Sequence, residues 1–317
     1  MGLLLFIVLI NDVGFKGQRN NAGEIITSKR NMKALNQIYL KYVDDLTLAE
    51  AINLPDNVIP VPDSEGQKPD MFHARTGHAL PINNSNVYKE LIRTMDYAKT
   101  NEMKINYKKT KVMIFNPCTS IDFMPEISLE KNELEVVDEV RLLGLIIRSD
   151  LKWTSNTENM FMRANNRIWI LRRLKYLGAK DCDLVDIYIK QIRSVLELAV
   201  PAWDGGLTLA EQMDIERIQR SVAHIILGHR YLSYKEALKT LNLESLQARR
   251  SKLCLKFARK SEKNVKFEKW FKRSYPKPNT RQEKFKYCDV VASHTRFEKS
   301  PLSSLTKMLN QYYNKKK

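Results

Sequence analysis

The stretch IYLKYVDDLTLAEA, residues 38–51, decides the fold of the first part of the chain. It places two adjacent aspartates, Asp44 and Asp45, between two short apolar runs, residues 38–43 and 46–49. This pattern predicts a β-hairpin with the acidic pair at its tip. Two neighbouring carboxylates repel each other, and a divalent cation held between their oxygens is a common way to make that arrangement useful. Aspartate is also a good turn former, so the pair alone leaves a purely structural role open.

The hydrophobic pattern around this hairpin predicts a mixed first half. Residues 55–84 contain five prolines and are typical of an irregular insertion. Apolar residues at three- and four-residue spacing then predict a helix over 85–101, and KVMIF, residues 111–115, predicts a strand. ISLEKNELEVV, residues 127–137, resembles a second hairpin, and RLLGLII, residues 141–147, one more strand.

Beyond Trp153 the pattern is almost wholly helical. The predicted helices cover residues 157–176, 181–198, 209–227, 233–240 and 245–262. A layer of strands with a packed helix, followed by helices alone, predicts the α+β fold class.

The charge of the chain is positive and unevenly distributed. Its 317 residues include 53 lysines and arginines against 36 aspartates and glutamates, a formal net charge of +17. Residues 1–150 hold 18 basic and 20 acidic side chains, whereas residues 251–317 hold 19 and 5. Clustered cations gain affinity for polyanions by releasing condensed counterions, so we expect a polyanionic partner for the second half. The alternative is a solvated basic tail, above all at Lys315, Lys316 and Lys317.

Cysteines, histidines and the N-terminal residues argue against several classes of protein. The four cysteines form no C-x-x-C pair, so neither a zinc site nor a disulfide framework is indicated. His73 and His78 have no cysteine near enough in sequence to suggest a shared metal. Residues 3–10 are apolar but too short to span a bilayer, and they lack the basic start of a signal peptide. We therefore expect a buried segment there and an intracellular protein, nuclear or cytoplasmic, that is neither secreted nor bound to a membrane.

Several ordered motifs resemble one protein family. The order of the first four matches that of reverse transcriptases from non-LTR (LINE-like) retrotransposons. They are LLLFIVLINDV (residues 3–13), YVDD (42–45), NEMKINYKKTKVMIF (101–115) and RLLGLIIRSDLKW (141–153). The likeness continues through SVLELAVPAW (194–203), ERIQRSVAHIILG (216–228), LNLESLQARR (241–250) and KSPLSSLTKMLN (299–310).

This resemblance implies a domain order and a chemistry. Residues 1–153 would form a partial polymerase palm, 154–262 a helical thumb and connection, and 263–317 a basic C-terminal extension. Such a palm transfers a nucleotide from a dNTP to the 3′ hydroxyl of a DNA primer on an RNA template. Two Mg²⁺ ions roughly 4 Å apart would activate the hydroxyl and neutralise the pyrophosphate. Asp44 would be the main metal ligand of the hairpin and Asp45 an auxiliary one.

The resemblance also implies that this catalytic site is incomplete. In the family a further metal-binding aspartate lies on an earlier strand, and the fingers and a nuclease domain also fall outside these residues. An apolar run that ends in Asp12 looks like a catalytic strand, but the match of residues 3–13 puts Asp12 past the following helix, in a structural role. Met1 falls inside a continuous family motif. We therefore expect an N-terminally truncated reverse transcriptase without polymerase activity of its own.

Matched positions in the palm are candidate contacts to the substrates. Asn106, Lys109, Thr110 and Lys111 match the box after the palm helix, where one lysine could stabilise or protonate the leaving pyrophosphate. The resemblance does not decide between Lys109 and Lys111, and a solvated strand start is the alternative. Leu143 and Gly144 match a hairpin that grips the primer, where glycine lets a nucleic-acid backbone approach closely. Tyr42 of the YVDD box is a further expected nucleic-acid contact.

Arginines of the first thumb helix are the remaining candidates. Arg163 and Arg167 lie four residues apart, and Arg172 and Arg173 follow, which predicts a basic stripe beside Trp169 that could track a primer–template backbone. Exposed helical arginines are common, however. A non-catalytic nucleic-acid-binding remnant is therefore the alternative function, and a poorly folding orphan fragment is a third possibility.

Overall fold

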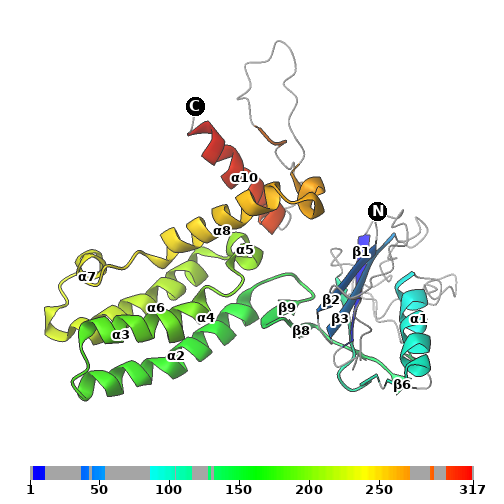
Figure 1. The fold of residues 1–317 in the computed structure, drawn as a ribbon, viewed down its shortest axis with the longest axis horizontal. Coiled ribbons are helices and arrows are strands. Elements are labelled where there is room, and N and C mark those ends of the chain that lie inside the picture. Colours follow the sequence, from blue (N-terminus) through cyan, green and yellow to red (C-terminus); the bar gives the residue numbers. More distant parts are fainter. Residues whose placement is uncertain are drawn as a thin grey trace, which may run out of the picture. The chain divides into compact units, whose positions relative to one another are not determined.

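The chain divides into two compact units, Met1–Leu151 and Lys152–Lys317. The computed structural model describes residues 3–10, 37–42, 45–53, 86–103, 105–115, 128–129, 132–271, 286–288 and 298–315. Strands β1 to β9 and one helix make up the described part of the first unit, and the second is mainly helical (Figure 1). The predicted α+β class is confirmed at this level.

The first unit centres on a five-stranded sheet with the order β2-β3-β1-β4-β7. All its neighbouring strands run antiparallel except β4 and β7, which are parallel. Two further pairs, β5 with β6 and β8 with β9, form separate hairpins. The bounds are β1 Leu3–Ile10, β2 Gln37–Tyr42, β3 Asp45–Asn53, α1 Asn86–Thr100, β4 Lys111–Phe115, β5 Ser128–Leu129, β6 Asn132–Glu133, β7 Glu135–Val136, β8 Glu139–Leu142 and β9 Leu145–Arg148.

The core of this unit lies between α1 and the sheet. Helix α1 packs against β1 and β3 and buries Val87, Leu91, Met95 and Ala98, whose spacing defines one face of the helix. In β4 the four residues after Lys111 are all buried, so both faces of this inner strand are covered. Burial of such apolar side chains contributes about 1.5–3 kcal/mol each to stability.

The predicted single strand over residues 141–147 is wrong, because the chain turns back in its middle. Leu143 and Gly144 connect β8 and β9 as a two-residue turn, and both have positive φ, 49° and 89°. Positive φ at both central residues is the geometry that matches the twist of a tight hairpin. Glycine adopts it without strain and leucine does not. The apolar pattern therefore hid a turn, whereas the hairpin that the family resemblance implied at Leu143 and Gly144 is confirmed.

The second unit is a layered set of helices. Their bounds are α2 Thr154–Tyr176, α3 Asp181–Ile187, a π-helical segment Tyr188–Arg193, α4 Ser194–Leu196, α5 Val200–Trp203, a 3-10 turn Asp204–Gly206, α6 Leu209–Leu227, a 3-10 turn Gly228–Arg230, α7 Tyr234–Thr240, α8 Leu246–Glu262, a 3-10 segment Val265–Trp270 and α10 Pro301–Asn314. Helix α6 packs against α2, α3, α7 and α8, and α10 packs against α8 and α5. None of the described helices combines the length and apolar character needed to cross a membrane.

A buried polar network runs through the middle of these helices. Gln219 of α6 is fully buried, and its Nε2 donates to the hydroxyl of Tyr234 at 3.0 Å and to the carbonyl of Glu244 at 2.9 Å. The hydroxyl of Tyr188 donates to the Gln219 Oε1, and that of Tyr234 donates to the carboxylate of Glu216. A buried amide without partners would cost about 1–3 kcal/mol, so this network fixes the relative positions of its helices.

Charged side chains join the later helices to this core. Arg250 of α8 is 2% exposed, and its Nε donates to Asp204 at 2.7 Å. Cys254, one turn further along α8, is also buried, and its thiol faces the second oxygen of Asp204 at 3.8 Å. Arg249 forms a two-pronged ion pair with Glu197, which precedes α5. Helix α8 is therefore held by charge as well as by apolar packing.

A second acidic centre holds the C-terminal helix. The carboxylate of Glu262, the last residue of α8, accepts from Lys286 Nζ at 2.7 Å and from the hydroxyl of Tyr313 at 2.7 Å. Tyr287 donates to it as well. Burial alone would raise the pKa of Glu262, but these three donors lower that pKa below its ordinary value. The carboxylate therefore stays charged and ties α10 to α8.

The β8–β9 turn yields a stability prediction. Replacing Leu143 by Asn should raise the free energy of unfolding by about 0.5–1 kcal/mol, because asparagine tolerates positive φ better than leucine. Gly144→Ala should lower it by about 1 kcal/mol for the opposite reason. Urea unfolding followed by circular dichroism measures both. A stabilising Gly144→Ala would contradict the assigned turn geometry.

Buried tyrosines and a buried thiol predict how stability depends on pH. Burial raises the pKa of Tyr188 well above its ordinary value, and it raises the pKa of Tyr287 and of Cys254 to about 12. In alkali the unfolded chain loses these protons first, so above about pH 9 the free energy of unfolding should fall as pH rises. Urea unfolding at about pH 8, 9 and 10 measures the slope. Tyr188→Phe should make that slope shallower, and an unchanged slope would count against the buried phenol.

Candidate functional site

The β2–β3 hairpin contains Asp45, the second aspartate of the acidic pair. Tyr42, the last residue of β2, pairs with Asp45, the first residue of β3, and the two strands run antiparallel. The strands predicted on either side of the pair are confirmed. Asp44 lies outside the described residues, as does Asp12, which follows the end of β1 at Ile10.

The register of the sheet brings a second predicted site to the same end as this hairpin. Thr47 of β3 pairs with Leu9 of β1, and Leu9 pairs with Lys111 of β4. Asp45 precedes Thr47 by two residues. Neighbouring strands are about 4.8 Å apart and each residue advances about 3.3 Å, so the starts of β3 and β4 lie at one edge of the sheet, separated only by β1.

A tight turn leads into β4 at this edge. The Asn106 carbonyl accepts the backbone N–H groups of Lys109 at 3.1 Å and Thr110 at 3.0 Å, and the buried Thr110 hydroxyl donates to the same carbonyl at 3.0 Å. The side chain of Lys109 is exposed. Lys111 forms an ion pair with Glu135 of β7, and its side chain is 25% exposed. Of the two predicted lysines, Lys109 is therefore the more accessible to a substrate.

The β8–β9 turn presents an apolar tip. Leu143 has a positive φ, and its side chain is 55% exposed. Non-glycine residues with strained backbone cluster at sites where a chain contacts a ligand. The predicted roles of Leu143 and Gly144 stay predictions, and Gly144 is accounted for by the turn itself.

In the second unit, helix α2 presents a mixed aromatic and basic surface. Met162, Trp169 and Tyr176 recur every seven residues and therefore lie on one face, where they are 59%, 62% and 81% exposed. Arg172 and Arg173 are exposed on either side of this line, and the guanidinium of Arg173 lies 5.6 Å from the centre of the Tyr176 ring. We call these five residues the outer face of α2.

The other two predicted arginines of α2 do not belong to the outer face. Arg163 and Arg167 are half-buried and border the face that packs on the neighbouring helices. Arg167 donates from Nη1 to the carbonyl of Gln191 in the π-helical segment. The structure therefore separates Trp169 from the arginine pair that sequence spacing placed beside it. Met162 and Tyr176 were missed, although their seven-residue recurrence with Trp169 is visible in the sequence.

The chemistry of the outer face suits a single-stranded or splayed nucleic acid. Exposed aromatic rings give bases a stacking surface, and arginines beside them can reach phosphates. By contrast, no group of three or more His, Cys, Asp or Glu side chains suited to a metal ion occurs among the residues that the structure describes, a set that excludes Asp44.

Binding of single-stranded RNA tests the outer face. Trp169→Ala should cost about 1–3 kcal/mol of binding free energy through lost stacking. The double change Arg172→Gln and Arg173→Gln should lower the slope of log affinity against log salt by about 1.4, because two phosphate contacts disappear. Fluorescence anisotropy over a series of salt concentrations measures both effects.

Arg163→Gln is the matched control, because it removes one positive charge from the same helix away from the outer face. Its salt slope should equal that of the unaltered chain. If affinity follows Arg163 rather than Arg172 and Arg173, the outer face is not the interface.

No protein-family model, no curated protein and no solved structure matches this chain.

Proposed function

We propose that this chain is the palm and thumb portion of an RNA-directed DNA polymerase of the non-LTR retrotransposon type. The reaction is nucleotidyl transfer from a dNTP to a primer 3′ hydroxyl on an RNA template. The observation that carries the proposal is the sheet register, in which the start of β3 at Asp45 and the start of β4 at Lys111 occupy one edge. This register supports the proposal because the residue 106–111 box leads into the same end of the sheet as the hairpin.

The acidic pair suits a divalent metal by its chemistry. Carboxylate oxygens are the ligands that Mg²⁺ prefers, and Asp44 and Asp45 would hold it. Bound there, Mg²⁺ would lower the pKa of the primer hydroxyl and offset charge on the pyrophosphate. The described backbone agrees with this donor set in one respect, since Asp45 opens a strand directly at the hairpin end.

Lys109 is the better candidate of the two lysines for the triphosphate. Its side chain is exposed on a turn whose backbone is fixed by the Asn106 carbonyl. A lysine there can attract the triphosphate and stabilise charge on the leaving pyrophosphate. Lys111 instead faces Glu135, so its ammonium helps to hold β7 against β4. In a fusion that extends primers, Lys109→Ala should therefore lower the rate of primer extension more than Lys111→Ala.

Primer extension tests the function. On an RNA template with a DNA primer, dNTPs and Mg²⁺, we expect no extension by the 317-residue chain, since its matched motifs include neither the third aspartate nor the fingers. The same chain fused to the fingers and first palm strand of a LINE-type polymerase should extend the primer. Asp44→Asn should abolish that activity, because it removes the main metal ligand.

Asp183→Asn is the control for this experiment. Asp183 is an exposed acid at the start of α3, so its loss should leave extension unchanged. Extension that survives Asp44→Asn would contradict the polymerase proposal. Extension by the unfused chain would instead mean that its own carboxylates complete the metal site.

A non-catalytic nucleic-acid-binding protein is the second candidate function. The observation that favours it is the outer face of α2, which offers stacking rings and exposed arginines without any need for the acidic hairpin. This candidate predicts RNA affinity that Trp169→Ala weakens and Asp44→Asn leaves unchanged.

A further inference from the structure

A pocket of about 320 Å³ lies between α6 and the first turns of α8. Its wall on α6 includes Met213, Arg217 and Arg220, and its wall on α8 includes Gln247 and Arg250. A volume near 300 Å³ is the lower end of the range for small-molecule sites. This pocket shares no residue with the acidic hairpin or with the outer face of α2.

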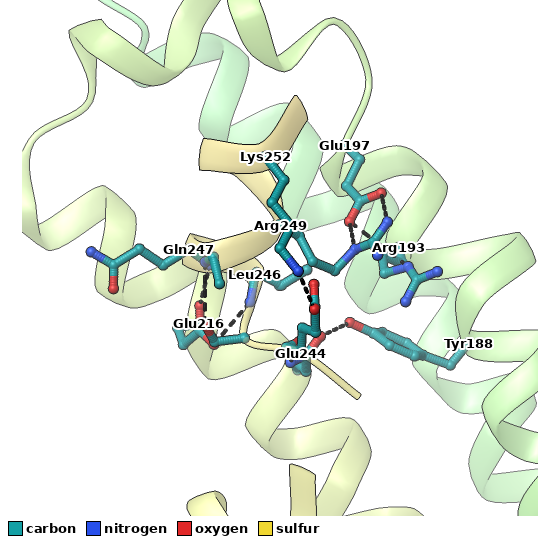
Figure 2. Close-up of polar contacts among 12 residues, drawn as sticks. Tyr188, Arg193, Glu197, Glu216, Glu244, Leu246, Gln247, Arg249 and Lys252 are labelled. Atoms are coloured by element: carbon teal, nitrogen blue, oxygen red, sulfur yellow. Dashed lines mark hydrogen bonds and ion pairs between the residues drawn. The ribbon is translucent and has the colours of Figure 1, made fainter. Parts of the chain in front are cut away.

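The one carboxylate in the pocket wall is already engaged. Glu216 accepts the backbone N–H of Leu246 on Oε1 at 3.1 Å and that of Gln247 on Oε2 at 3.2 Å, as Figure 2 shows. Tyr234 also donates to Oε1. The acid therefore caps the N-terminus of α8, where the helix dipole favours a negative charge. Its carboxylate oxygens are therefore engaged at the helix terminus, and the other charged side chains of the pocket wall are arginines.

Three arginines of the pocket wall have unused capacity for an anion. Arg250 is buried, and its Nη1 has no hydrogen-bond partner among the described residues, although its Nε is bound to Asp204. Arg220 is exposed, lies over the Tyr234 ring at 5.2 Å and forms no ion pair with a described carboxylate. Arg217 pairs with Asp214, but its side chain is 67% exposed, so this pair is weak.

The unpartnered Nη1 of Arg250 is a reason to expect a bound group next to this side chain. A buried guanidinium N–H without an acceptor is costly, and native proteins usually satisfy such groups with an ion, water or ligand. Arginine donors in a fixed fork match the oxygens of a phosphate group well. The exposed side chains of Leu209 and Met213 extend the same pocket with an apolar surface.

We propose that this pocket binds the phosphate group of a phosphate ester. Arg217, Arg220 and Arg250 donate to the phosphate oxygens, and Leu209 and Met213 contact the apolar body of the ester. The ester is either a free nucleotide-sized molecule or the terminal phosphate of a nucleic-acid strand, which present the same group. The site goes beyond the proposed polymerase function and stands or falls separately from it.

Calorimetric titration of the full chain tests this proposal with four probes. They are inorganic phosphate, adenosine monophosphate, and a short oligonucleotide with and without a 5′ phosphate. Arg220→Gln should weaken binding of every phosphate-bearing probe about tenfold, because one charge-assisted bond is lost. Met213→Ala should weaken binding of adenosine monophosphate but not of inorganic phosphate. Arg250 is left unaltered, since its bond to Asp204 also supports the fold.

Two controls keep the result specific. Lys239→Gln removes an exposed positive charge from α7 outside the pocket and should leave every affinity unchanged. Inorganic phosphate carries no base to stack, so Trp169→Ala should leave its affinity unchanged, which separates this site from the outer face of α2. Thermal melts establish that each variant is folded.

The two possible sources of the phosphate group predict different affinities. A preference for the phosphorylated oligonucleotide over adenosine monophosphate that Arg220→Gln removes supports a nucleic-acid source of the phosphate. Equal affinity for the two supports a free ester. The proposal is overturned if no phosphate-bearing probe binds at millimolar concentration, or if Arg220→Gln binds all probes as the unaltered chain does.

Discussion

The helical unit depends on the fully buried side-chain amide of Gln219. Its donors and acceptor engage Tyr188, Tyr234 and the Glu244 carbonyl, which come from three different segments. Since leaving any one unpaired would cost about 1–3 kcal/mol, those segments have little freedom to shift. Through Tyr234 the constraint passes to Glu216, which caps α8. This chain of hydrogen bonds therefore connects the amide of Gln219 to the N-terminus of α8, beside the pocket on α6.

The sheet of the first unit imposes a different constraint, that of register. A slip of one residue between β1 and β3 would reverse the face of every side chain on a strand, because side chains alternate. The observed pairing of Ile10 with Leu46 sets the edge at which β3 begins and β4 starts. The acidic hairpin and the lysine box are far apart in sequence, so this register is what relates them. Pairing rather than local sequence thus determines whether they can act together.

Sequence patterns predicted elements best where local chemistry alone specifies them. Helix α6 occupies the predicted residues 209–227, because Thr208 and Glu211 form a capping box and a glycine at residue 228 ends the helix. The predicted helix over residues 181–198 is instead interrupted by a π-helical segment, Tyr188–Arg193, which the apolar period does not reveal. Helix α10 was not predicted, although Ser300 at its N-cap, Pro301 in its first turn and the spacing of Leu305 and Leu309 are local signals of a helix.

In the candidate sites too, local sequence predicts some features and tertiary packing determines others. The spacing of Arg163 and Arg167 correctly put them on one side of α2, but which side faces solvent is decided by the helices packed against it. Arg250 carries no sequence signal of its burial.

The burial of the Cys254 thiol affects its reactivity. Among the described cysteines, Cys182 and Cys288 are exposed, so electrophiles and oxidants will reach these two before Cys254. Reaction at Cys254 requires α8 to separate from Asp204. The rate at which a reagent modifies this thiol therefore reports how often the helical unit opens.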